Sequence, residues 1–384
     1  MKIAFESQLF LKGNKTGIAW CADNLIKELS YYGSNQINYF SFGYSDATLK
    51  QMKIYEKCGM KLKPCCWFHD VVYKLIWPII PVPYSLFFGK DADITQFFNC
   101  VVPPGVKGKS VVIVHDMAYK VYPETVREKT KRWLQLTLKT SCRRADAIVT
   151  VSEASKQDII KYLGVESDKI TVMPNGVDLS LFHNQYKEAE IEKVKQKYGI
   201  QRDYFLYLGT LEPRKNIPNL LHAYKELIIK NGGNKDNLPL LVIAGGKGWL
   251  YDSIFETVTK LSLEKEVLFT GYVGVNEAPK LMAGARAFLF PSLYEGFGMP
   301  PIEAMACGTP VISSNVSSLP EVVGDAGILV NPNSPIEICK AMERILSDEE
   351  LRSELVEKGL NRAKMYTWKN SAKILYDLYR RLLE

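Results

Sequence analysis

The sequence has few histidines, and its cysteines are not clustered as in a metal site or a disulfide framework. It contains only four histidines, and its eight cysteines are scattered, with Cys65 and Cys66 as the one close pair. That pair has no further Cys or His at the spacing of a zinc site, and scattered thiols are typical of a cytosolic protein. We therefore expect reduced cysteines and no bound metal.

Long hydrophobic runs are also missing. No stretch approaches the roughly 18 apolar residues that a membrane-spanning helix needs, and the first residues, 1–7, have the pattern of a short charged strand rather than of a signal peptide. With 384 residues, of which 47% are hydrophobic and 24% charged, the composition is that of a globular protein large enough for two domains. A cytoplasmic location is the simplest expectation.

The net charge of +7 is moderate and allows three anionic partners: nucleic acid, an acidic membrane surface or an anionic substrate. No nucleic-acid motif is present. One segment, 120–144, concentrates the basic residues in a helical pattern: Lys120, Arg127, Lys129, Lys131, Arg132, Lys139, Arg143 and Arg144. It has two interpretations, a peripheral membrane-facing helix or the solvated basic face of a packed helix.

The segment 65–88 is rich in aromatic residues interleaved with prolines. Because proline interrupts regular elements, we expect short helical pieces and loops here. Exposed aromatic side chains would indicate a surface for lipid or for a partner, whereas buried ones would belong to the core. Both interpretations stay open, and the first would favour a lipid-linked substrate.

The most informative stretch is 287–313. An apolar run at Ala287–Phe290 predicts a strand, a loop with Gly296 and Gly298 follows it, and a helix is expected over 300–306, ending before Gly308. Glycines let a backbone approach a ligand closely, and a helix N-terminus offers unpaired N–H groups with a partial positive charge. This strand, loop and helix therefore suit an anion, above all a phosphate.

Two carboxylates, Glu295 and Glu303, bracket this loop. A carboxylate accepts hydrogen bonds, so such a pair can hold hydroxyl groups of a ligand on either side of a phosphate. The alternative is that Glu303 only complements the helix dipole and that Glu295 is a solvated loop residue.

The segment Glu295-Gly-Phe-Gly-Met-Pro-Pro-Ile-Glu303 resembles the E-x7-E signature of the retaining glycosyltransferases of family four, which have the GT-B fold. The resemblance implies that Glu295 holds hydroxyls of the donor sugar and that Glu303 binds the ribose. It also implies that backbone amides at Phe297, Gly298 and Met299 hold the diphosphate.

A second signal lies after the strand expected at 204–208, where Gly209 is followed by Arg214 and Lys215 before a helix. Two cations there can neutralise a diphosphate leaving group without a metal. They match the Arg and Lys of the family. Further on, the run ending in Gly245 repeats the pattern of a strand followed by glycine, without the spacing of an ATP-binding phosphate loop. We expect these glycines to line the pocket of the nucleotide base.

The amino-terminal half begins with a strand at 2–6, a glycine-containing loop at 13–17 and a helix at 18–32 whose apolar side includes Trp20. Gly17 resembles the family's glycine near the donor diphosphate. The apolar run 111–114 ends in His115 and Asp116, where the carboxyl end of a parallel strand meets ligands. These two resemble the family's His-Asp beside the donor sugar. We expect His115 in the site, with Asp116 orienting it or contacting the acceptor.

Strands and helices alternate along the whole chain, which predicts α/β architecture with two Rossmann-like domains facing a cleft, as in the GT-B fold. We expect an acceptor-binding domain at 1–182 and a donor-binding domain at 183–367. An amphipathic helix is expected at 368–384 and, by resemblance, packs back on the first domain.

The resemblance implies transfer of a hexose, with retention, from a nucleotide-diphosphate sugar and without a cofactor. Mannose from GDP-mannose is favoured over UDP-hexoses, and the acceptor is a saccharide or a polyprenyl-linked saccharide of a cell-surface polysaccharide. The alternatives are a sugar-nucleotide 2-epimerase of the same fold and a non-catalytic donor-binding partner subunit.

Overall fold

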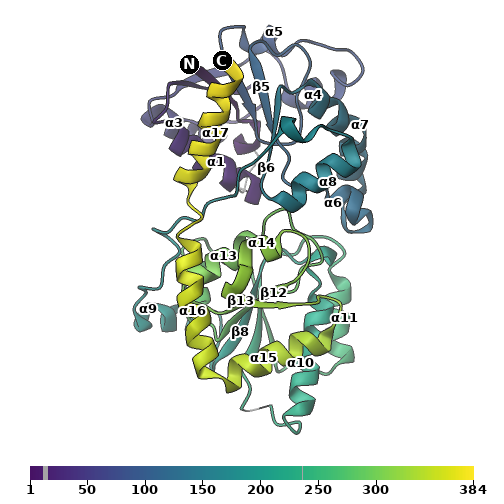
Figure 1. The fold of residues 1–384 in the computed structure, drawn as a ribbon, viewed down its shortest axis with the longest axis vertical. Coiled ribbons are helices and arrows are strands. Elements are labelled where there is room, and N and C mark those ends of the chain that lie inside the picture. The colour runs from purple at the N-terminus through teal and green to yellow at the C-terminus, as the bar shows by residue number, and fades with distance from the viewer. Residues whose placement is uncertain (12–15, 236) are drawn as a thin grey trace. The chain divides into compact units, whose positions relative to one another are not determined.

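The computed structural model describes residues 1–11, 16–235 and 237–384, and the chain divides into two compact units (Figure 1). The first unit comprises Met1–Gly176 and Trp368–Glu384, and the second comprises Val177–Thr367. Residues 177–182, which we expected in the first domain, thus belong to the second unit. The backbone N–H of Val177 donates to the carbonyl of Tyr366 at 2.9 Å, which ties the start of this segment to the second unit.

The first unit is built on a parallel sheet with the strand order β3-β2-β1-β4-β5-β6-β7 among the described residues. Its strands are β1 (Lys2–Glu6), β2 (Ser34–Phe40), β3 (Lys61–Cys65), β4 (Ile94–Phe97), β5 (Lys109–Ile113), β6 (Ala147–Thr150) and β7 (Ile170–Val172). Parallel strands need helical crossovers that cover both faces of the sheet, so central strands such as β4 and β6 are buried throughout.

The α-helices of the first unit are α1 (Gly17–Leu29), α2 (Asp46–Lys50), α3 (Lys53–Lys57), α4 (Asp70–Ile76), α5 (Ser85–Phe88), α6 (Ala118–Val121), α7 (Glu128–Arg144), α8 (Glu153–Leu163) and α17 (Trp368–Leu383). The direction of connection reverses between β1 and β4, because the strands before β4 lie on one side of β1 and the later ones on the other. Such a switch point leaves a crevice outside the carboxyl ends of the two strands.

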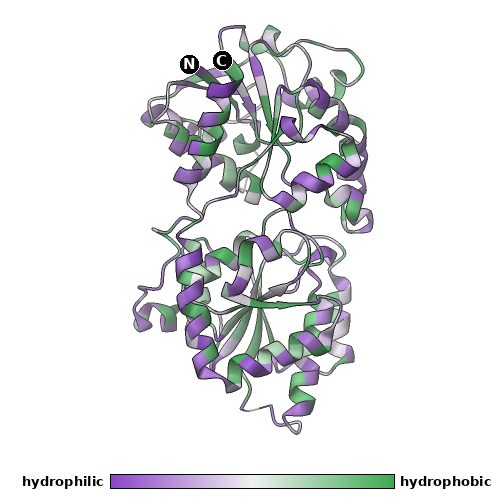
Figure 2. Ribbon diagram, viewed as in Figure 1, coloured by the Kyte–Doolittle hydropathy of each residue, from purple (hydrophilic) through white to green (hydrophobic). Residues whose placement is uncertain are grey.

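The second unit has the same plan, with the parallel order β10-β9-β8-β11-β12-β13 in the described chain. Its strands are β8 (Tyr204–Leu208), β9 (Leu240–Ala244), β10 (Val267–Gly271), β11 (Ala287–Phe290), β12 (Val311–Ser314) and β13 (Gly327–Val330). Figure 2 shows most residues of these strands as hydrophobic, while the surrounding helices carry hydrophilic residues. Here the switch point lies between β8 and β11.

The α-helices of the second unit are α9 (Glu188–Lys197), α10 (Ile217–Lys230), α11 (Asp252–Lys260), α12 (Ala278–Ala283), α13 (Met299–Ala306), α14 (Leu319–Val323), α15 (Pro335–Ser347) and α16 (Glu349–Ala363). A 3-10 helix, Pro213–Lys215, lies between β8 and α10.

The carboxy-terminal helix α17 belongs to the first unit, as the resemblance implied. Its Tyr376 ring stacks on Tyr32 with the ring centroids 4.5 Å apart, and the Tyr379 hydroxyl donates to Gln96 Oε1 at 2.7 Å. The Ser371 hydroxyl donates to the carbonyl of Pro174 at 2.6 Å. The last helix therefore completes the core of the unit that contains the amino terminus.

One detail differs from expectation, and one open alternative is decided by the structure. Trp20, which we placed on the apolar side of the first helix, is 41% exposed, because the buried face of α1 is formed by residues such as Leu25 and Leu29 instead. In the aromatic segment 65–88 most rings are buried and Trp67 is 57% exposed, so this segment mainly serves the core. Among the helices of the described residues, none combines the length and the apolar character needed to cross a bilayer.

Candidate active site

The loop after β8 carries Arg214 and Lys215 in a short 3-10 helix. Asn216 ends that helix in the left-handed conformation, with φ at 59°. Its side-chain amide donates to the carbonyls of Pro291 at 3.1 Å and of Pro332 at 2.7 Å, and both acceptors lie on neighbouring loops. Asn216 therefore fastens the cationic loop to the carboxyl end of β11.

The loop after β11 presents Glu295, which is 8% exposed. Its carboxylate Oε1 accepts a hydrogen bond of 2.6 Å from the hydroxyl of Ser292. Its backbone carbonyl accepts from the hydroxyls of Ser317 at 2.6 Å and Ser318 at 2.9 Å. Both ends of Glu295 are thus held in place by short polar side chains.

The two loops meet in a compact cluster of charges. Lys215 Nζ lies 2.6 Å from Glu295 Oε1, and Arg214 Nη1 lies 2.9 Å from Glu295 Oε2. Arg214 also contacts Glu212 at 2.7 Å and donates to the carbonyl of Tyr294 at 2.6 Å. Two cations are thereby balanced by two carboxylates.

Glu212 is a member of this cluster that sequence reasoning missed. It is 5% exposed and its carboxylate orients the guanidinium of Arg214. No pattern in the sequence identifies it, since a Glu two residues before an Arg is common in solvated turns. Ser292, Ser317 and Ser318 were missed for the same reason, because their contacts depend on the fold.

The electrostatics follow from burial and from the close pairing. Burial alone would raise the pKa of Glu295, but Arg214 and Lys215 outweigh it and lower that pKa to about 2. Burial lowers the pKa of Lys215, which Glu295 partly offsets. Burial raises the pKa of Glu212 despite the nearby cations. Glu295 is therefore firmly ionised at neutral pH.

The position of the cluster matches the architecture. β8 and β11 are neighbours in the sheet, and the cluster forms at the carboxyl ends of this pair, at the switch point of the second unit. Open parallel sheets bind their ligands at this place. Sequence reasoning assigned Arg214, Lys215 and Glu295 to one site, and the structure brings these three together.

The amides at the start of α13 are the part of the site that we expected to bind an anion. Within the described residues, the backbone N–H groups of Phe297, Gly298 and Met299 have no hydrogen-bond acceptor. Pro300 and Pro301 follow directly and have no N–H, so fewer donors are available than a helix N-terminus usually offers. The binding capacity of this end therefore lies in the three preceding amides.

Gly298 gives this turn its shape. Its φ of +100° lies in the region that favours glycine, and an added Cβ would lie 2.6 Å from Leu319 Cδ2. The loop therefore needs glycine here for both conformation and space.

Glu303 lies on the second turn of α13, apart from the charge cluster. Its carboxylate has no ion pair or hydrogen bond with the part of the chain that the structure describes, and burial raises its pKa to about 7. An acceptor group without a partner suits a ligand with hydroxyl groups, which is the role that the resemblance implies.

Gly209 and Gly245 directly follow the neighbouring strands β8 and β9. A Cβ added to Gly245 would lie 1.9 Å from the carbonyl oxygen of Gly209, and φ at Gly245 is +142°. Close packing of the two backbones therefore already requires glycine at 245. Contact of these residues with a nucleotide base stays a prediction.

His115 and Asp116 follow β5 in the first unit. His115 Nε2 lies 3.1 Å from the carbonyl oxygen of Phe98. A carbonyl only accepts, so Nε2 carries the proton and Nδ1 is the acceptor of the neutral ring. Burial lowers the pKa of His115, although the Phe98 carbonyl and Asp116 both act in the opposite direction.

We expected Asp116 to orient His115, but the imidazole donates its Nε2–H to the carbonyl of Phe98 instead. The Asp116 carboxylate instead accepts from the backbone N–H of Ala118 at 2.9 Å, at the start of α6. Asp116 thus influences His115 through charge and shapes the local turn. A contact with the acceptor stays a prediction.

Gly17 is the first residue of α1, and Thr16 caps this helix through a hydrogen bond of 3.4 Å from Ala19 N–H. Gly17 is exposed and a Cβ there would meet no atom within 4 Å. Most of the loop expected at 13–17 lies outside the described residues. The described residues contain no group of three or more His, Cys, Asp and Glu side chains placed to hold a metal.

Two family models match the sequence. The model described as glycosyl transferases group 1 matches residues 190–362, and the model described as glycosyltransferase family 4 matches residues 97–181. The first match contains the charge cluster and α13, and the second contains His115.

Solved structures with the same fold cover nearly the whole chain. Anabaena HepE in complex with UDP and glucose gives a TM-score of 0.74 at 19% identity, covering 99% of this chain and 100% of HepE. Sucrose-phosphate synthase from Thermosynechococcus elongatus gives a TM-score of 0.75 at 19% identity, covering 100% and 99%. These likenesses establish the GT-B fold.

Curated relatives are more similar in sequence. The chain is 36% identical over 275 residues to O-antigen chain mannosyltransferase B of Escherichia coli, covering 71% of each protein. It is 31% identical over 297 residues to O-antigen chain mannosyltransferase RfbU of Salmonella typhimurium, covering 77% of this chain and 75% of RfbU. The E. coli mannosyltransferase WbdA is 29% identical over 82% of this chain, which spans 38% of WbdA. The chain therefore belongs to the group 1 glycosyltransferases, within glycosyltransferase family 4.

Proposed function

We propose that this glycosyltransferase moves mannose from GDP-mannose to a saccharide or lipid-linked saccharide acceptor during synthesis of a cell-surface polysaccharide. The choice of sugar is supported by two relatives with more than 30% identity that are named O-antigen chain mannosyltransferases. In this proposal the second unit binds the donor and the first unit binds the acceptor.

The observation that carries donor binding is the buried cluster of Arg214, Lys215 and Glu295 beside the amides that start α13. Lys215 uses one of its three N–H donors on Glu295 and makes no second hydrogen bond within the described chain. A diphosphate can therefore bind to Lys215 and to the backbone amides while Glu295 keeps its cations. The carboxylate of Glu295 then accepts hydrogen bonds from the sugar hydroxyls.

Departure of the nucleoside diphosphate leaves negative charge on its terminal phosphate. That charge is stabilised by Arg214, Lys215 and the amides of the α13 loop. Their neighbours orient these groups before the charge develops, so no reorganisation is needed during the reaction. The proposal therefore assigns the neutralising role to side chains and amides instead of a metal ion.

Retention of the anomeric configuration is the second part of the proposal. Glu295 is a weak nucleophile because two cations and the Ser292 hydroxyl hold its oxygens and lower its pKa to about 2. We therefore assign the role of base to the departing phosphate oxygen, which takes the proton of the acceptor hydroxyl as that hydroxyl attacks from the same face of the sugar. His115 Nδ1 accepts a hydrogen bond from a sugar hydroxyl.

A location in the cytoplasm, with peripheral contact at the inner face of the cell membrane, completes the proposal. It is supported by α7, whose basic residues outnumber its acidic ones. The vesicle experiment described below tests this contact.

The purified protein incubated with GDP-mannose and an oligosaccharide acceptor tests the function. We expect transfer that persists in EDTA and a product whose anomeric proton, observed by NMR, shows the configuration of the donor. Transfer from a UDP-hexose alone would contradict the choice of donor. A changed sugar nucleotide in the absence of acceptor would indicate an epimerase, and absence of turnover with bound donor would indicate a non-catalytic subunit.

A further inference from the structure

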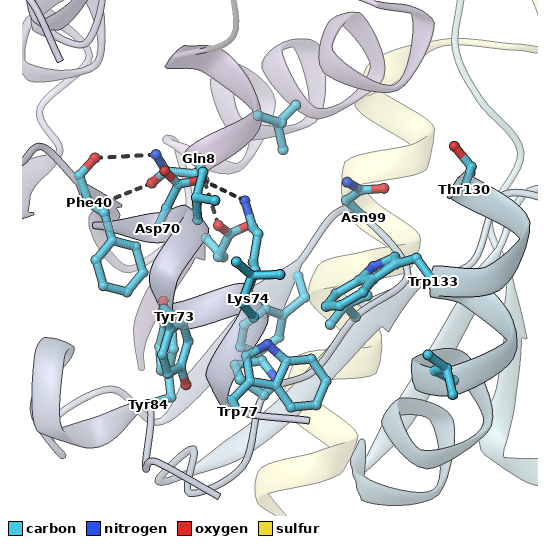
Figure 3. A pocket seen from close by; sticks show the side chains of 18 of the residues that line it. Gln8, Phe40, Asp70, Tyr73, Lys74, Trp77, Tyr84, Asn99, Thr130 and Trp133 are labelled. Carbon is cyan, nitrogen blue, oxygen red and sulfur yellow. Dashed lines mark hydrogen bonds and ion pairs between the residues drawn. The ribbon is translucent and has the colours of Figure 1, made fainter. Parts of the chain in front are cut away.

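The first unit contains a cavity of about 680 Å³ (Figure 3). It is lined by residues at or after the carboxyl ends of β1 and β4, including Glu6 and Phe97, and by side chains of α4 and α7. It thus occupies the switch point of this unit, where open parallel sheets bind ligands. Its volume lies within the usual range of roughly 300–1,000 Å³ for ligand sites.

Aromatic side chains form the inner part of the cavity. Figure 3 shows Phe40, Tyr73, Trp77 and Tyr84 grouped on one side of it. Trp77 meets Trp133 of α7 edge to face, with the ring centroids 6.1 Å apart. Four of these rings are buried in the protein even though they border the cavity, so they offer carbon surface to an occupant.

The hydroxyls of the two tyrosines are already engaged. Tyr73 donates to the carbonyl of Val82 at 3.3 Å, and Tyr84 accepts from Asn38 Nδ2 at 3.2 Å. An occupant with hydroxyl groups would lose hydrogen bonds to water in this inner part and would find few replacements, which is costly. The inner part therefore favours a hydrocarbon over a sugar ring.

Polar side chains gather at the other side of the cavity. Figure 3 shows Asn99 and Thr130 there, apart from Gln8 and Asp70, which lie beside Phe40. Gln8 is occupied by two hydrogen bonds with the backbone of Phe40, whereas Asn99 and Thr130 have no hydrogen-bonding partner for their side chains among the described residues. This side can serve the polar part of an elongated ligand.

The cavity is lined by three cations, Lys74, Lys129 and Arg132, and by two carboxylates, Glu6 and Asp70. Lys74 pairs with Asp70 at 2.8 Å, and Arg132 pairs with Glu128 at 2.8 Å. Lys129 also lines the cavity and has no ion pair within the described chain. One cation is thus available beside an apolar interior, which is the arrangement needed for a hydrocarbon that ends in a phosphate.

We propose that this cavity binds the acceptor itself, as a glycolipid in which a phosphate joins the saccharide to a hydrocarbon chain. The chain occupies the aromatic interior between α4 and α7, the phosphate lies at Lys129, and the saccharide begins at Asn99 and Thr130. This inference rests on the proposed function and names its acceptor class. The occupant is the acceptor's own chain and not the bulk membrane, because the rings of Phe40, Tyr73, Trp77 and Tyr84 are buried below the surface of the unit.

Calorimetric titration with farnesyl phosphate and with farnesol, both below their micelle concentrations, tests the proposal. We expect wild-type protein to bind the phosphate more tightly than the alcohol. Thr130→Trp places a large ring at the cavity and should lower the affinity for both ligands by at least tenfold. Lys129→Ala should lower the affinity for farnesyl phosphate about tenfold, which corresponds to one charge-assisted hydrogen bond, and should leave the affinity for farnesol unchanged.

Matched controls lie ten residues further along the same helix. Thr140 and Lys139 are exposed on α7 and do not line the cavity. Thr140→Trp and Lys139→Ala should therefore bind both ligands as the wild type does. The proposal would be overturned if the cavity variants and the control variants lost affinity for the ligands equally, or if the wild type bound neither ligand.

Co-sedimentation with acidic phospholipid vesicles that lack any glycolipid separates the acceptor from the membrane. We expect Thr130→Trp to sediment with these vesicles as much as the wild type does. If Thr130→Trp lost vesicle binding by as large a factor as it loses affinity for farnesyl phosphate, this surface would be assigned to the membrane and the acceptor site would be refuted. Transfer to a lipid-free oligosaccharide shows whether the proposed function stands. Normal transfer without farnesyl phosphate binding would refute only this inference, and absent donor binding would refute the function.

Discussion

Replacing Lys215 by methionine should expose the balance of charges in the donor site. The Lys215 and Glu295 side chains are 11% and 10% exposed and are joined at 2.6 Å. Breaking a buried ion pair costs about 3–5 kcal/mol when the remaining charge is left alone. Arg214 still contacts Glu295 at 2.9 Å, so we expect Lys215→Met to lower the free energy of unfolding by about 2 kcal/mol.

Adding Glu295→Gln to Lys215→Met restores neutrality, because Arg214 then faces only Glu212. We therefore expect the double variant to regain more than half of the lost stability. For a domain of this size about 2 kcal/mol corresponds to a shift in melting temperature of roughly 4–8 °C. Turnover should stay about two to four powers of ten below wild type in both variants, since a preorganised cation is missing.

Differential scanning calorimetry and steady-state kinetics measure the two quantities separately. The pKa of Glu295 is lowered from its ordinary 4.5 to about 2, so its contribution to stability is complete above pH 4.5 and is lost as the pH falls toward 2. The difference between wild type and Lys215→Met should shrink over the same range. A double variant less stable than the single one, or a single variant as stable as wild type, would refute the reasoning.

Three further predictions concern single residues. Burial lowers the pKa of His115 below 6.5, so the wild-type free energy of unfolding should fall as the pH drops below 6.5. In urea titrations at several pH values, His115→Gln should show a smaller fall. Parallel plots of stability against pH for the two proteins would contradict this prediction. The pKa of Glu303 is raised to about 7, so the folded protein loses stability as the pH rises from 4.5 to 7. The Glu303→Gln variant should therefore melt at a higher temperature than the wild type at pH 8 and at the same temperature at pH 4. The affinity of this variant for the nucleotide should no longer depend on pH near 7. Gly298→Ala should cost about 1–3 kcal/mol because its φ is +100°, whereas Gly246→Ala, where an added Cβ has no neighbour within 4 Å, should melt like wild type; equal melting temperatures for the two variants would refute this explanation.

Much of the fold could be predicted because it depends on local patterns. The strand at Ala287–Phe290 and the helix that follows were expected within a residue of where they lie, since an apolar run bounded by glycines can form little else in an α/β protein. The expected boundary of the second domain was less accurate. The pairing of Val177 with Tyr366 joins residues far apart in the sequence, and no local pattern announces it.

The burial of aromatic residues shows the same limit. Trp20 was expected in the core and is exposed, and most of the rings in 65–88 were equally compatible with surface and core. Helical periodicity identifies one face of a helix, but it does not say how far the neighbouring element extends over that face. Only the packing of the first unit decides which rings are covered.

The sequence by itself determined the alternation of strands and helices, the glycine turn at 298 and the presence of Arg214, Lys215 and Glu295 on loops that follow strands. Those features depend on the chemistry of each residue and on its near neighbours. Only the tertiary structure decided that Glu212 and Ser292 complete the charge cluster, that Phe98 orients His115, and that side chains of α4 and α7 line an aromatic cavity. These arrangements join distant segments through the order of the strands, and that order is set by the packing of the whole sheet.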